Sequence, residues 1–343
     1  MKIIVDAMGG DNAPFEIVKG SLRAARELDL DIVLTGREEE IARCFKELGC
    51  EGIPDRMSVV NATEVIEMCD EPSLAYRRKS DSSMTVGLNL LKNGEGDALV
   101  SAGSTGALLS GATLVVKRIR GVRRAALAPL LPTKTGHVMV IDVGANVECA
   151  PEHLVQFALL GSGYMKGVMN MEAPRVGLLN NGTEETKGAP LQVETYPQLQ
   201  QLHDEGKINF IGNVEAKDVM RGVCDVVVCD GYSGNILLKG IEGAAGFIMG
   251  ELKEILTASG KNKAAALLLK KDLYGLKDRM SASKVGGTAL LGISKPVVKA
   301  HGSSDAEAFF NAVRQASVVA GSGMIEAVTQ QLKKTEDGDG KEA

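Results

Sequence analysis

The chain has 343 residues, of which 44% are hydrophobic and 24% are charged, and its net charge is −5. This length and composition predict a globular protein with a substantial core and exclude a fibrous or low-complexity chain. The acidic balance disfavours nucleic acid as a partner. No apolar run reaches the roughly 20 residues of a membrane-spanning helix. The six cysteines form no CxxC pair, and no secretory leader precedes the first predicted strand, so we expect reduced thiols and a cytoplasmic protein.

Apolar, β-branched runs alternate along the chain with stretches of helical periodicity. The predicted strands cover 3–6, 31–35, 58–61, 98–101, 125–131, 138–142, 176–180, 209–212 and 223–229. The predicted helices cover 14–28, 38–48, 84–91, 105–116, 151–169, 190–203 and 234–256. This alternation predicts βαβ units and an α/β fold with a mainly parallel, doubly wound sheet. We expect one α/β domain over 1–332, with two lobes as an alternative, and a disordered tail over 333–343.

Glycine-rich polar loops follow the first and fourth predicted strands. Their candidate ligand-binding residues are Asp6, Gly9, Gly10 and Asp11 in the first loop, and Ser101, Gly103, Ser104 and Thr105 in the second. The second loop ends a strand and opens a helix, so free N–H groups and hydroxyls could hold a phosphate at the positive end of the helix dipole. The alternatives are a turn that only needs Gly and Asx residues, and simple helix capping by Ser104.

Polar side chains also follow later strands. Further candidate binding residues are Asn146, Thr183, Asp230, Ser233, Gly234 and Ser303. Lys187 could bind phosphate or polarise a carbonyl, unless it forms a salt bridge with a neighbouring glutamate. Asn235 could donate to an oxyanion, and His301 could donate a proton or contact phosphate. Cys149 and His153, one helical turn apart, offer an alternative in which a thiolate acts with an adjacent base.

Five of these loops, within 6–14, 101–107, 142–146, 175–188 and 225–239, follow strands that we predict to be parallel, so the carboxyl ends of these strands should share one edge of a sheet. Ligands of open α/β sheets bind outside that edge, and we therefore expect one cleft that binds a small anion. The sequence has neither GxxxxGK[ST] nor GxGxxG, and it has no adjacent Cys/His ligand set. It predicts no nucleotide cofactor and no metal.

Two segments carry clustered basic residues on this acidic chain. Residues 261–284 combine lysines with an apolar stripe, which predicts a basic amphipathic helix. The stripe consists of Ala266, Leu269, Leu273, Leu276 and Met280. It could pack on the core, form a dimer interface or lie on an anionic membrane. The second cluster consists of Lys117, Arg118, Arg120, Arg123 and Arg124. Such a cluster is either a solvated face or a surface for an acidic macromolecule.

A series of motifs stands in order along most of the chain. They are DAMGGDNAP at 6–14, DEP at 70–72, RRKSDSSM at 77–84, SAGSTGA at 101–107, APLLPT at 128–133, DVGAN at 142–146, RVGLLNNGTEETKG at 175–188, IGNVE at 211–215, DGYSGNILLK at 230–239 and KAHGSS at 299–304. In combination they closely resemble the bacterial phosphate acyltransferase family. The resemblance implies a three-layer α/β/α fold like that of isocitrate dehydrogenases and phosphate acetyltransferases, a homodimer, and peripheral attachment to the inner face of the cell membrane.

The same resemblance implies an activity. A long-chain acyl group would pass from an acyl carrier protein thioester to inorganic phosphate, and the acyl phosphate would serve a glycerol-phosphate acyltransferase in phospholipid synthesis. Under this hypothesis Ser104, Thr105 and Lys187 bind phosphate, Asn235 stabilises the oxyanion, and His301 protonates the leaving thiolate. Three alternatives remain open: a decarboxylating NAD-dependent dehydrogenase, a short-chain phosphate acetyltransferase, and an anion-binding scaffold for lipid enzymes.

Overall fold

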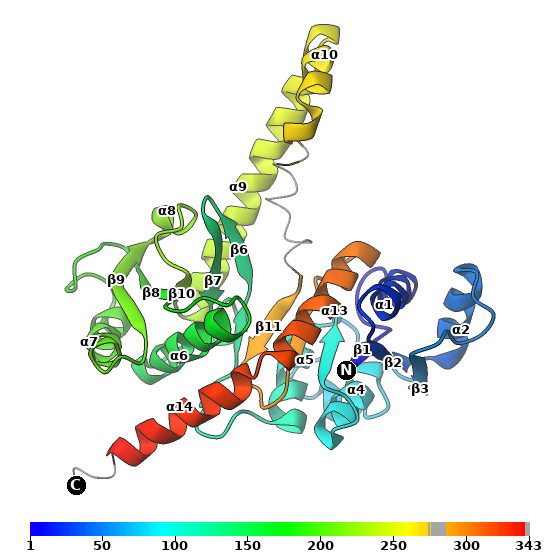
Figure 1. Ribbon diagram of the computed structural model, residues 1–343, viewed down its shortest axis with the longest axis horizontal. Helices are drawn as coiled ribbons and strands as arrows, with labels where there is room; N and C mark the ends of the chain where they lie inside the picture. Colours follow the sequence, from blue (N-terminus) through cyan, green and yellow to red (C-terminus); the bar gives the residue numbers. More distant parts are fainter. Residues whose placement is uncertain (274, 276–285, 340–343) are drawn as a thin grey trace.

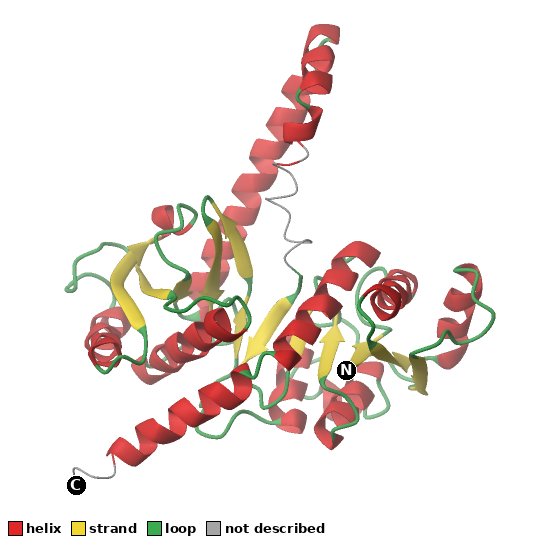
Figure 2. Ribbon diagram, in the orientation of Figure 1, coloured by secondary structure: helices red, strands yellow, loops and turns green. Residues whose placement is uncertain are grey.

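The computed structural model describes residues 1–273, 275 and 286–339. Two sheets, each covered by helices, lie side by side in Figure 1. One has seven strands in the order β3-β2-β1-β4-β12-β11-β5, and the other has five strands in the order β6-β7-β10-β8-β9. Figure 2 shows that helices and strands alternate through both parts. The chain thus has the expected α/β fold, with its strands divided between two sheets.

The seven-stranded sheet is mainly parallel. Its parallel strands are β1 (Lys2–Asp6), β2 (Asp31–Gly36), β3 (Met57–Asn61), β4 (Ala98–Ser101) and β12 (Val297–Lys299). At one side β11 (Thr288–Leu291) runs antiparallel to both β12 and β5 (Ala126–Ala128). The helices of this part are α1 (Phe15–Glu27), α2 (Glu38–Glu47), α3 (Ala75–Arg78), α4 (Ser83–Asn93), α5 (Thr105–Gly111), the π-helix η1 (Ala112–Val116) and α13 (Ala306–Gly321).

The five-stranded sheet has the same character. The strands β7 (Gly136–Ile141), β10 (Val226–Val228), β8 (Arg175–Asn180) and β9 (Asn209–Glu215) are parallel, and β6 (Leu130–Thr133) pairs antiparallel with β7. Its helices are α6 (Pro151–Gly167), α7 (Pro190–Asp204), α8 (Ala216–Val219) and α14 (Met324–Asp339). Both α6 and α7 begin with Pro, whose missing N–H costs nothing in the first turn of a helix.

The core forms three layers around each sheet. Side chains of α1 and α13 pack on one face of the seven-stranded sheet, where Phe309 and Ile17 are buried. A second cluster covers the opposite face with α4 and α5, through Leu88 and Leu108, and continues into β7 and β10 of the other sheet. The third cluster places α6 against the five-stranded sheet, with Phe157 fully buried. The shared second cluster joins the two sheets into one molecule.

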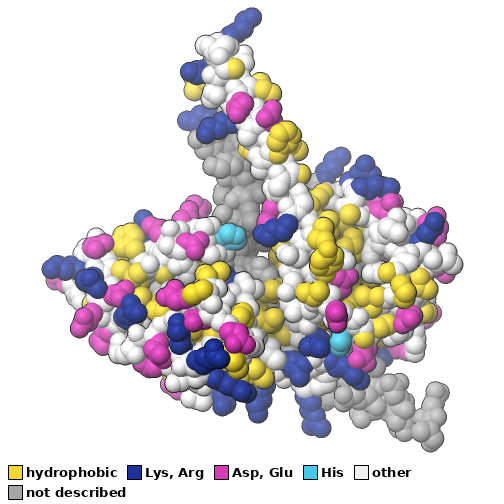
Figure 3. Space-filling view, turned by 180° about the vertical axis from the view of Figure 1, so that it is seen from behind, with side chains coloured by type: hydrophobic (Ala, Val, Ile, Leu, Met, Phe, Trp, Pro, Cys, Tyr) yellow, Lys and Arg dark blue, Asp and Glu magenta, His cyan; other side chains and the backbone are white. Residues whose placement is uncertain are grey.

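One helix leaves this compact body. The helix α9 (Gly231–Thr257) starts after β10 and projects outward, and α10 (Gly260–Leu268) folds back on its far end. Only Gly231 and Gly234 of α9 are buried. Figure 3 shows yellow hydrophobic side chains along this projection. None of the described helices is both long and apolar enough to cross a membrane.

Most predicted elements are confirmed, with informative differences. The predicted strand 125–131 is two strands, because Pro129 has no N–H for a sheet and the chain changes sheets there. The prediction missed β11 and β12. It also placed a disordered tail over 333–343, whereas α14 continues to Asp339. Of the basic amphipathic segment 261–284, the structure describes α10 and the residues up to 273; Leu276 and Met280 lie outside the described residues.

Candidate functional site

Three of the predicted loops meet at the carboxyl edge of the seven-stranded sheet. Asp6, Ser101 and Lys299 end β1, β4 and β12, and the register places Ser101 between the other two. Their exposed fractions are 1%, 0% and 9%. We call residues 6–12, 101–105 and 299–304 the Ser101 edge. It starts from a row of buried polar groups, which is unusual because burial of such groups is costly unless they are paired.

Asp6 is paired through short hydrogen bonds. The Ser101 hydroxyl donates to Asp6 Oδ2 over 2.6 Å, and the Gly103 N–H donates to Ser101 Oγ over 3.0 Å. Burial raises the pKa of the Asp6 carboxyl, and the hydrogen bond from Ser101 opposes that rise. A Cβ at Gly9 would lie 2.7 Å from the Gly103 nitrogen, so only glycine permits the first loop to approach the second. These loops therefore form one interlocked unit.

Lys299 is a buried cation that the sequence analysis did not select. Its Nζ donates to the Ala102 carbonyl over 3.2 Å and to the Ala300 carbonyl. Burial lowers its pKa to about 8, against the opposing effect of the nearby Asp6 and Asp11 carboxylates. The signal was a lysine that directly follows an apolar β-branched pair, which marks the end of a strand. The prediction instead selected His301 and Ser303 from the same motif.

The rest of the Ser101 edge is held by its backbone. The Asp11 N–H donates to the Gly302 carbonyl over 2.8 Å. His301 is exposed, and its Nδ1 lies 2.9 Å from the Ser303 hydroxyl. The alternative of helix capping by Ser104 is wrong, because its side chain makes no capping hydrogen bond at the start of α5. Thr105, the next residue, is exposed.

The other predicted loops lie at the carboxyl edge of the five-stranded sheet. They follow β7, β8 and β10, and β10 lies between the other two strands. We call residues 142–146, 180–188 and 230–235 the Asn235 edge. The expectation that all these loops share one edge of a single sheet is therefore wrong. The reason is the change of sheet at Pro129, which local sequence patterns do not reveal.

Asp142 organises the Asn235 edge from a fully buried position. Its carboxylate accepts hydrogen bonds from the Leu127 N–H over 2.8 Å and the Asn146 N–H over 2.6 Å. The Asn146 side-chain amide donates to the Ala125 carbonyl and to Asp142, so both of its N–H groups are used within the protein. Burial raises the pKa of Asp142, and the backbone N–H donors oppose the rise. The amide of Asn146 thus fixes the loop.

The start of α9 packs directly on that loop. Asp230 is its N-cap and accepts from both the N–H and the hydroxyl of Ser233, each over 2.8 Å. A Cβ at Gly234 would lie 1.9 Å from the Asp142 carbonyl oxygen, which only glycine avoids. Asn235 is exposed, and its Cβ and Cγ lie about 4 Å from the position that a Cβ added to Gly144 would occupy. Its amide therefore stands over the 142–146 loop.

Lys187 lies in the loop after β8 and is exposed. Among the described residues it has no ion-pair partner; Glu185 instead accepts from the Tyr196 hydroxyl over 3.3 Å. The loop is shaped by backbone contacts, since the Lys187 carbonyl accepts from the Asn180 side chain over 2.9 Å. The alternative of a salt bridge with a neighbouring glutamate is thus wrong. Thr183 is exposed in the same loop.

Comparison with known proteins places the chain in a family. Residues 1–327 match the family model described as "Fatty acid synthesis protein". A phosphate acyltransferase of Caldanaerobacter subterraneus is 45% identical over 338 residues, which is 98% of this chain and 99% of that one. One from Geobacillus thermodenitrificans is 48% identical over 337 residues, which is 98% of this chain and 100% of that one. The chain belongs to this family of phosphate acyltransferases.

Solved structures show the same fold at low sequence identity. A phosphotransacetylase from Streptococcus pyogenes has a TM-score of 0.64 at 18% identity and covers 93% of this chain and 94% of its own. A branched-chain phosphotransacylase from Enterococcus faecalis has a TM-score of 0.55 at 15% identity and covers 93% and 99%. This phosphate acyltransferase therefore has the three-layer fold that the resemblance implied.

The alternative of a Cys149 thiolate that acts with His153 is wrong for this phosphate acyltransferase. Burial raises the pKa of the Cys149 thiol to about 11, and its Sγ donates to the Asn146 carbonyl over 3.6 Å. His153 does not face it: its Nδ1 accepts from the Ala150 N–H, and its Nε2 lies 3.7 Å from Glu152. The one-turn spacing had suggested a pair, but His153 serves the capping of α6.

Proposed function

We propose that the protein transfers a long-chain acyl group from an acyl carrier protein thioester to inorganic phosphate. The product, an acyl phosphate, would supply phospholipid synthesis through a glycerol-phosphate acyltransferase. Membership of the phosphate acyltransferase family supports the reaction class. The observation that carries the proposal is at the Asn235 edge. The neighbouring strands β8 and β10 lead there to Lys187, an exposed cation that pairs with no acid among the described residues, and to Asn235, whose side-chain amide is exposed.

The chemistry fits these groups. A phosphate oxygen forms a bond to the thioester carbonyl carbon, the carbon–sulfur bond breaks, and the carrier thiolate takes up a proton. Near neutral pH phosphate is largely a dianion, since its second pKa is about 6 to 7, so it needs no general base. The protein has to bring two anions together and stabilise the carbonyl oxygen as charge develops, and each well-aimed donor contributes roughly 3 kcal/mol.

We assign these roles residue by residue. Lys187 holds the phosphate, and Asn235 donates to the carbonyl oxygen. We further propose that the two edges bind the same substrates, so that Ser104 and Thr105 of the Ser101 edge contribute N–H and hydroxyl donors to the phosphate, and His301 protonates the leaving thiolate. The last role is modest, because a thiol with a pKa of about 8.5 leaves readily without help.

The decisive experiment mixes the protein with a long-chain acyl carrier protein and phosphate. We expect free thiol and hydroxylamine-trappable acyl phosphate to appear in equal amounts. Acetyl-coenzyme A is the matched donor for a short-chain phosphate acetyltransferase, and we expect much slower turnover with it. Thiol release without acyl phosphate, or faster turnover with the acetyl donor, would contradict the proposal.

We also propose that the protein acts as a homodimer at the inner face of the cell membrane. The projecting α9–α10 unit supports this, because its large apolar side chains are exposed, at 67% for Phe247 and 86% for Leu268. Among the described residues outside α9's own turns, none lies within 4 Å of a Cβ added at Gly243, so another helix could approach closely there. Phe247→Glu should convert dimers to monomers in sedimentation, and Leu268→Glu should reduce flotation with anionic vesicles. Unchanged mass and flotation would contradict both parts.

A further inference from the structure

A basic loop lies between η1 and β5 of the phosphate acyltransferase. We define it as residues 117–124. It carries five cations and no acid, and all five are exposed: Lys117, Arg118, Arg120, Arg123 and Arg124. The two apolar members point the other way, since Ile119 and Val122 are 3% and 5% exposed. The loop therefore anchors itself by its apolar residues and presents its charges to solvent.

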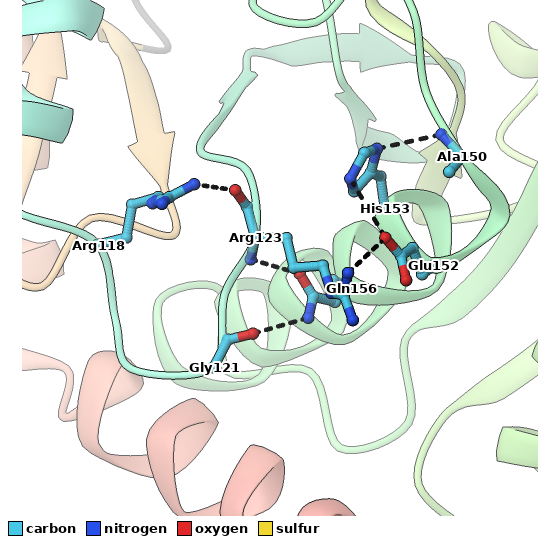
Figure 4. A network of polar contacts seen from close by, with 7 residues as sticks. All are labelled: Arg118, Gly121, Arg123, Ala150, Glu152, His153 and Gln156. Atoms are coloured by element: carbon cyan, nitrogen blue, oxygen red, sulfur yellow. Dashed lines mark hydrogen bonds and ion pairs between the residues drawn. The ribbon is translucent and has the colours of Figure 1, made fainter.

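The basic loop is held in one shape by hydrogen bonds. The Ile119 N–H donates to the Gly292 carbonyl over 2.9 Å. On its other side Gln156 of α6 accepts from the Arg123 N–H over 2.8 Å and donates to the Gly121 carbonyl over 2.9 Å, as Figure 4 shows. A surface that is already ordered loses less conformational entropy when a partner binds. These bonds thus favour a defined docking face over a mobile solvated segment.

Little of the loop's charge is neutralised by the protein itself. Arg123 pairs with Glu152 over 2.8 Å, and both side chains are well exposed. The Arg118 guanidinium donates to the Arg123 carbonyl, which leaves its charge uncompensated. Within the described residues Lys117, Arg120 and Arg124 have no ion-pair partner. The result is a net positive surface on a chain whose total charge is −5.

The basic loop also adjoins the Asn235 edge. The residue after Arg124 is Ala125, whose carbonyl accepts from the Asn146 side chain over 2.8 Å. The other basic segment, on α10, lies at the far end of α9, and a helix of 27 residues is roughly 40 Å long. A partner that docks on the basic loop can therefore deliver a substrate to the Asn235 edge over a much shorter path.

We infer that the basic loop is the docking surface for the acidic carrier protein that delivers the acyl thioester. This inference rests on the proposed function, which makes such a carrier the acyl donor. Complementary charges speed encounter and orient the partner, and here they would place the thioester arm beside Asn235. The surface therefore acts on binding of the carrier and leaves the chemistry of the bound thioester unchanged.

The test is a charge reversal with a matched control. Arg120→Glu/Arg124→Glu alters the basic loop, and Lys261→Glu/Lys263→Glu makes the same charge change at the far end of α9. Each variant is assayed with the acyl carrier protein and with the same acyl group on free pantetheine. For the loop variant we expect kcat/KM to fall at least about tenfold with the carrier and less than about twofold with pantetheine. The variant Arg120→Lys/Arg124→Lys keeps both positive charges and should retain most of the activity with the carrier.

Three outcomes would overturn the inference: unchanged kcat/KM with the carrier, an equal loss with both donors, or an equal loss in the control variant. An equal loss with both donors would assign the loop to the site or the fold, and an equal loss in the control would assign docking to total charge. Calorimetric titration of the carrier protein into wild type and loop variant, at low and high salt, provides a second measurement. This titration tests docking of the carrier even if the wild type forms no acyl phosphate. The lack of acyl phosphate would contradict only the proposed function.

Discussion

The two sheet edges each contain a buried carboxylate, but they differ in the position of their lysine. At the Ser101 edge Asp6 and Lys299 are buried and occupied by hydrogen bonds within the protein. At the Asn235 edge Asp142 plays that internal role, while Lys187 and Asn235 stand exposed. The contrast suggests that buried charges shape the loops, and that exposed groups above them meet the substrate. It also means that buried charge alone is a poor guide to a catalytic residue.

The largest effect should come from breaking the packing under the Asn235 edge. Gly234→Ala would place a methyl group 1.9 Å from the Asp142 carbonyl oxygen, so we expect a loss of about 3 kcal/mol in the free energy of unfolding. Urea denaturation measures it. Gly250→Ala, at an exposed position farther along the same helix where no described residue lies within 4 Å of an added Cβ, is the control and should stabilise by about 0.5–1 kcal/mol. Equal effects of the two substitutions would refute this account of the packing.

The second prediction concerns the buried charge at the Ser101 edge. The Lys299 pKa is about 8 in the folded protein and 10.5 ordinarily, so between these values the unfolded chain binds more protons. The free energy of unfolding should therefore rise with pH across that window, by roughly 3 kcal/mol in total. Lys299→Met should remove the rise, and the same change at exposed Lys92 should preserve it. A rise of the same size in Lys299→Met would show that another group causes it.

The third prediction tests the exposed cation. Lys187→Ala should lower acyl phosphate formation at least about tenfold, because a donor to the phosphate is lost. Its melting temperature should stay near that of the wild type, since the side chain is exposed and pairs with no acid in the part of the chain that the structure describes. Lys217, which pairs with Glu215 over 2.6 Å, is the matched control, and Lys217→Ala should leave the rate unchanged. Full activity of Lys187→Ala would exclude Lys187 from the mechanism.

The smallest effect should come from His301. Its replacement by Ala should lower kcat only about twofold to fivefold with the carrier thioester, because the thiolate leaves readily without an acid. A donor whose thiol has a higher pKa should make the loss larger. The measurement is the dependence of kcat on the pKa of the leaving thiol, in wild type and variant. Parallel dependences would show that His301 transfers no proton in the rate-limiting step.

Much of the fold was readable from local patterns. The strand 98–101 was predicted with its observed bounds, because it consists of four apolar or small residues and a glycine-rich loop follows it directly. The sequence did not reveal β12, since three residues carry little periodicity and its partner β4 lies about 200 residues earlier. That pairing is what brings Lys299 to Ser101. The two valines before Lys299 mark the end of a strand in the sequence, but the position of that strand beside β4 follows only from the sheet order.

Many residues of the candidate site could be predicted from the sequence. Their distribution over the edges of two separate sheets could not. The loops at Asp142, Lys187 and Asn235 were correctly placed at the ends of strands, because Gly and Asx residues follow apolar runs. Which strands share a sheet depends on contacts between distant segments, and the change of sheet falls at Pro129. The sequence also did not distinguish the roles of Asn146 and Asn235, because both are asparagines in polar loops. The structure distinguishes them by their neighbours, since the Asn146 amide donates within the protein and the Asn235 amide is exposed.

The junction at Pro129 limits how this molecule can open. Ala128 ends β5 in one sheet and Leu130 begins β6 in the other, so one residue spans the crossing. The proline ring fixes its φ, and the Leu127 N–H and carbonyl are both tied to the 142–146 loop, through Asp142 and Val143. A wide swing of one sheet away from the other would break those bonds. Access for a bulky acyl donor should therefore depend on rearrangement of surface loops, with the angle between the sheets nearly constant through the catalytic cycle.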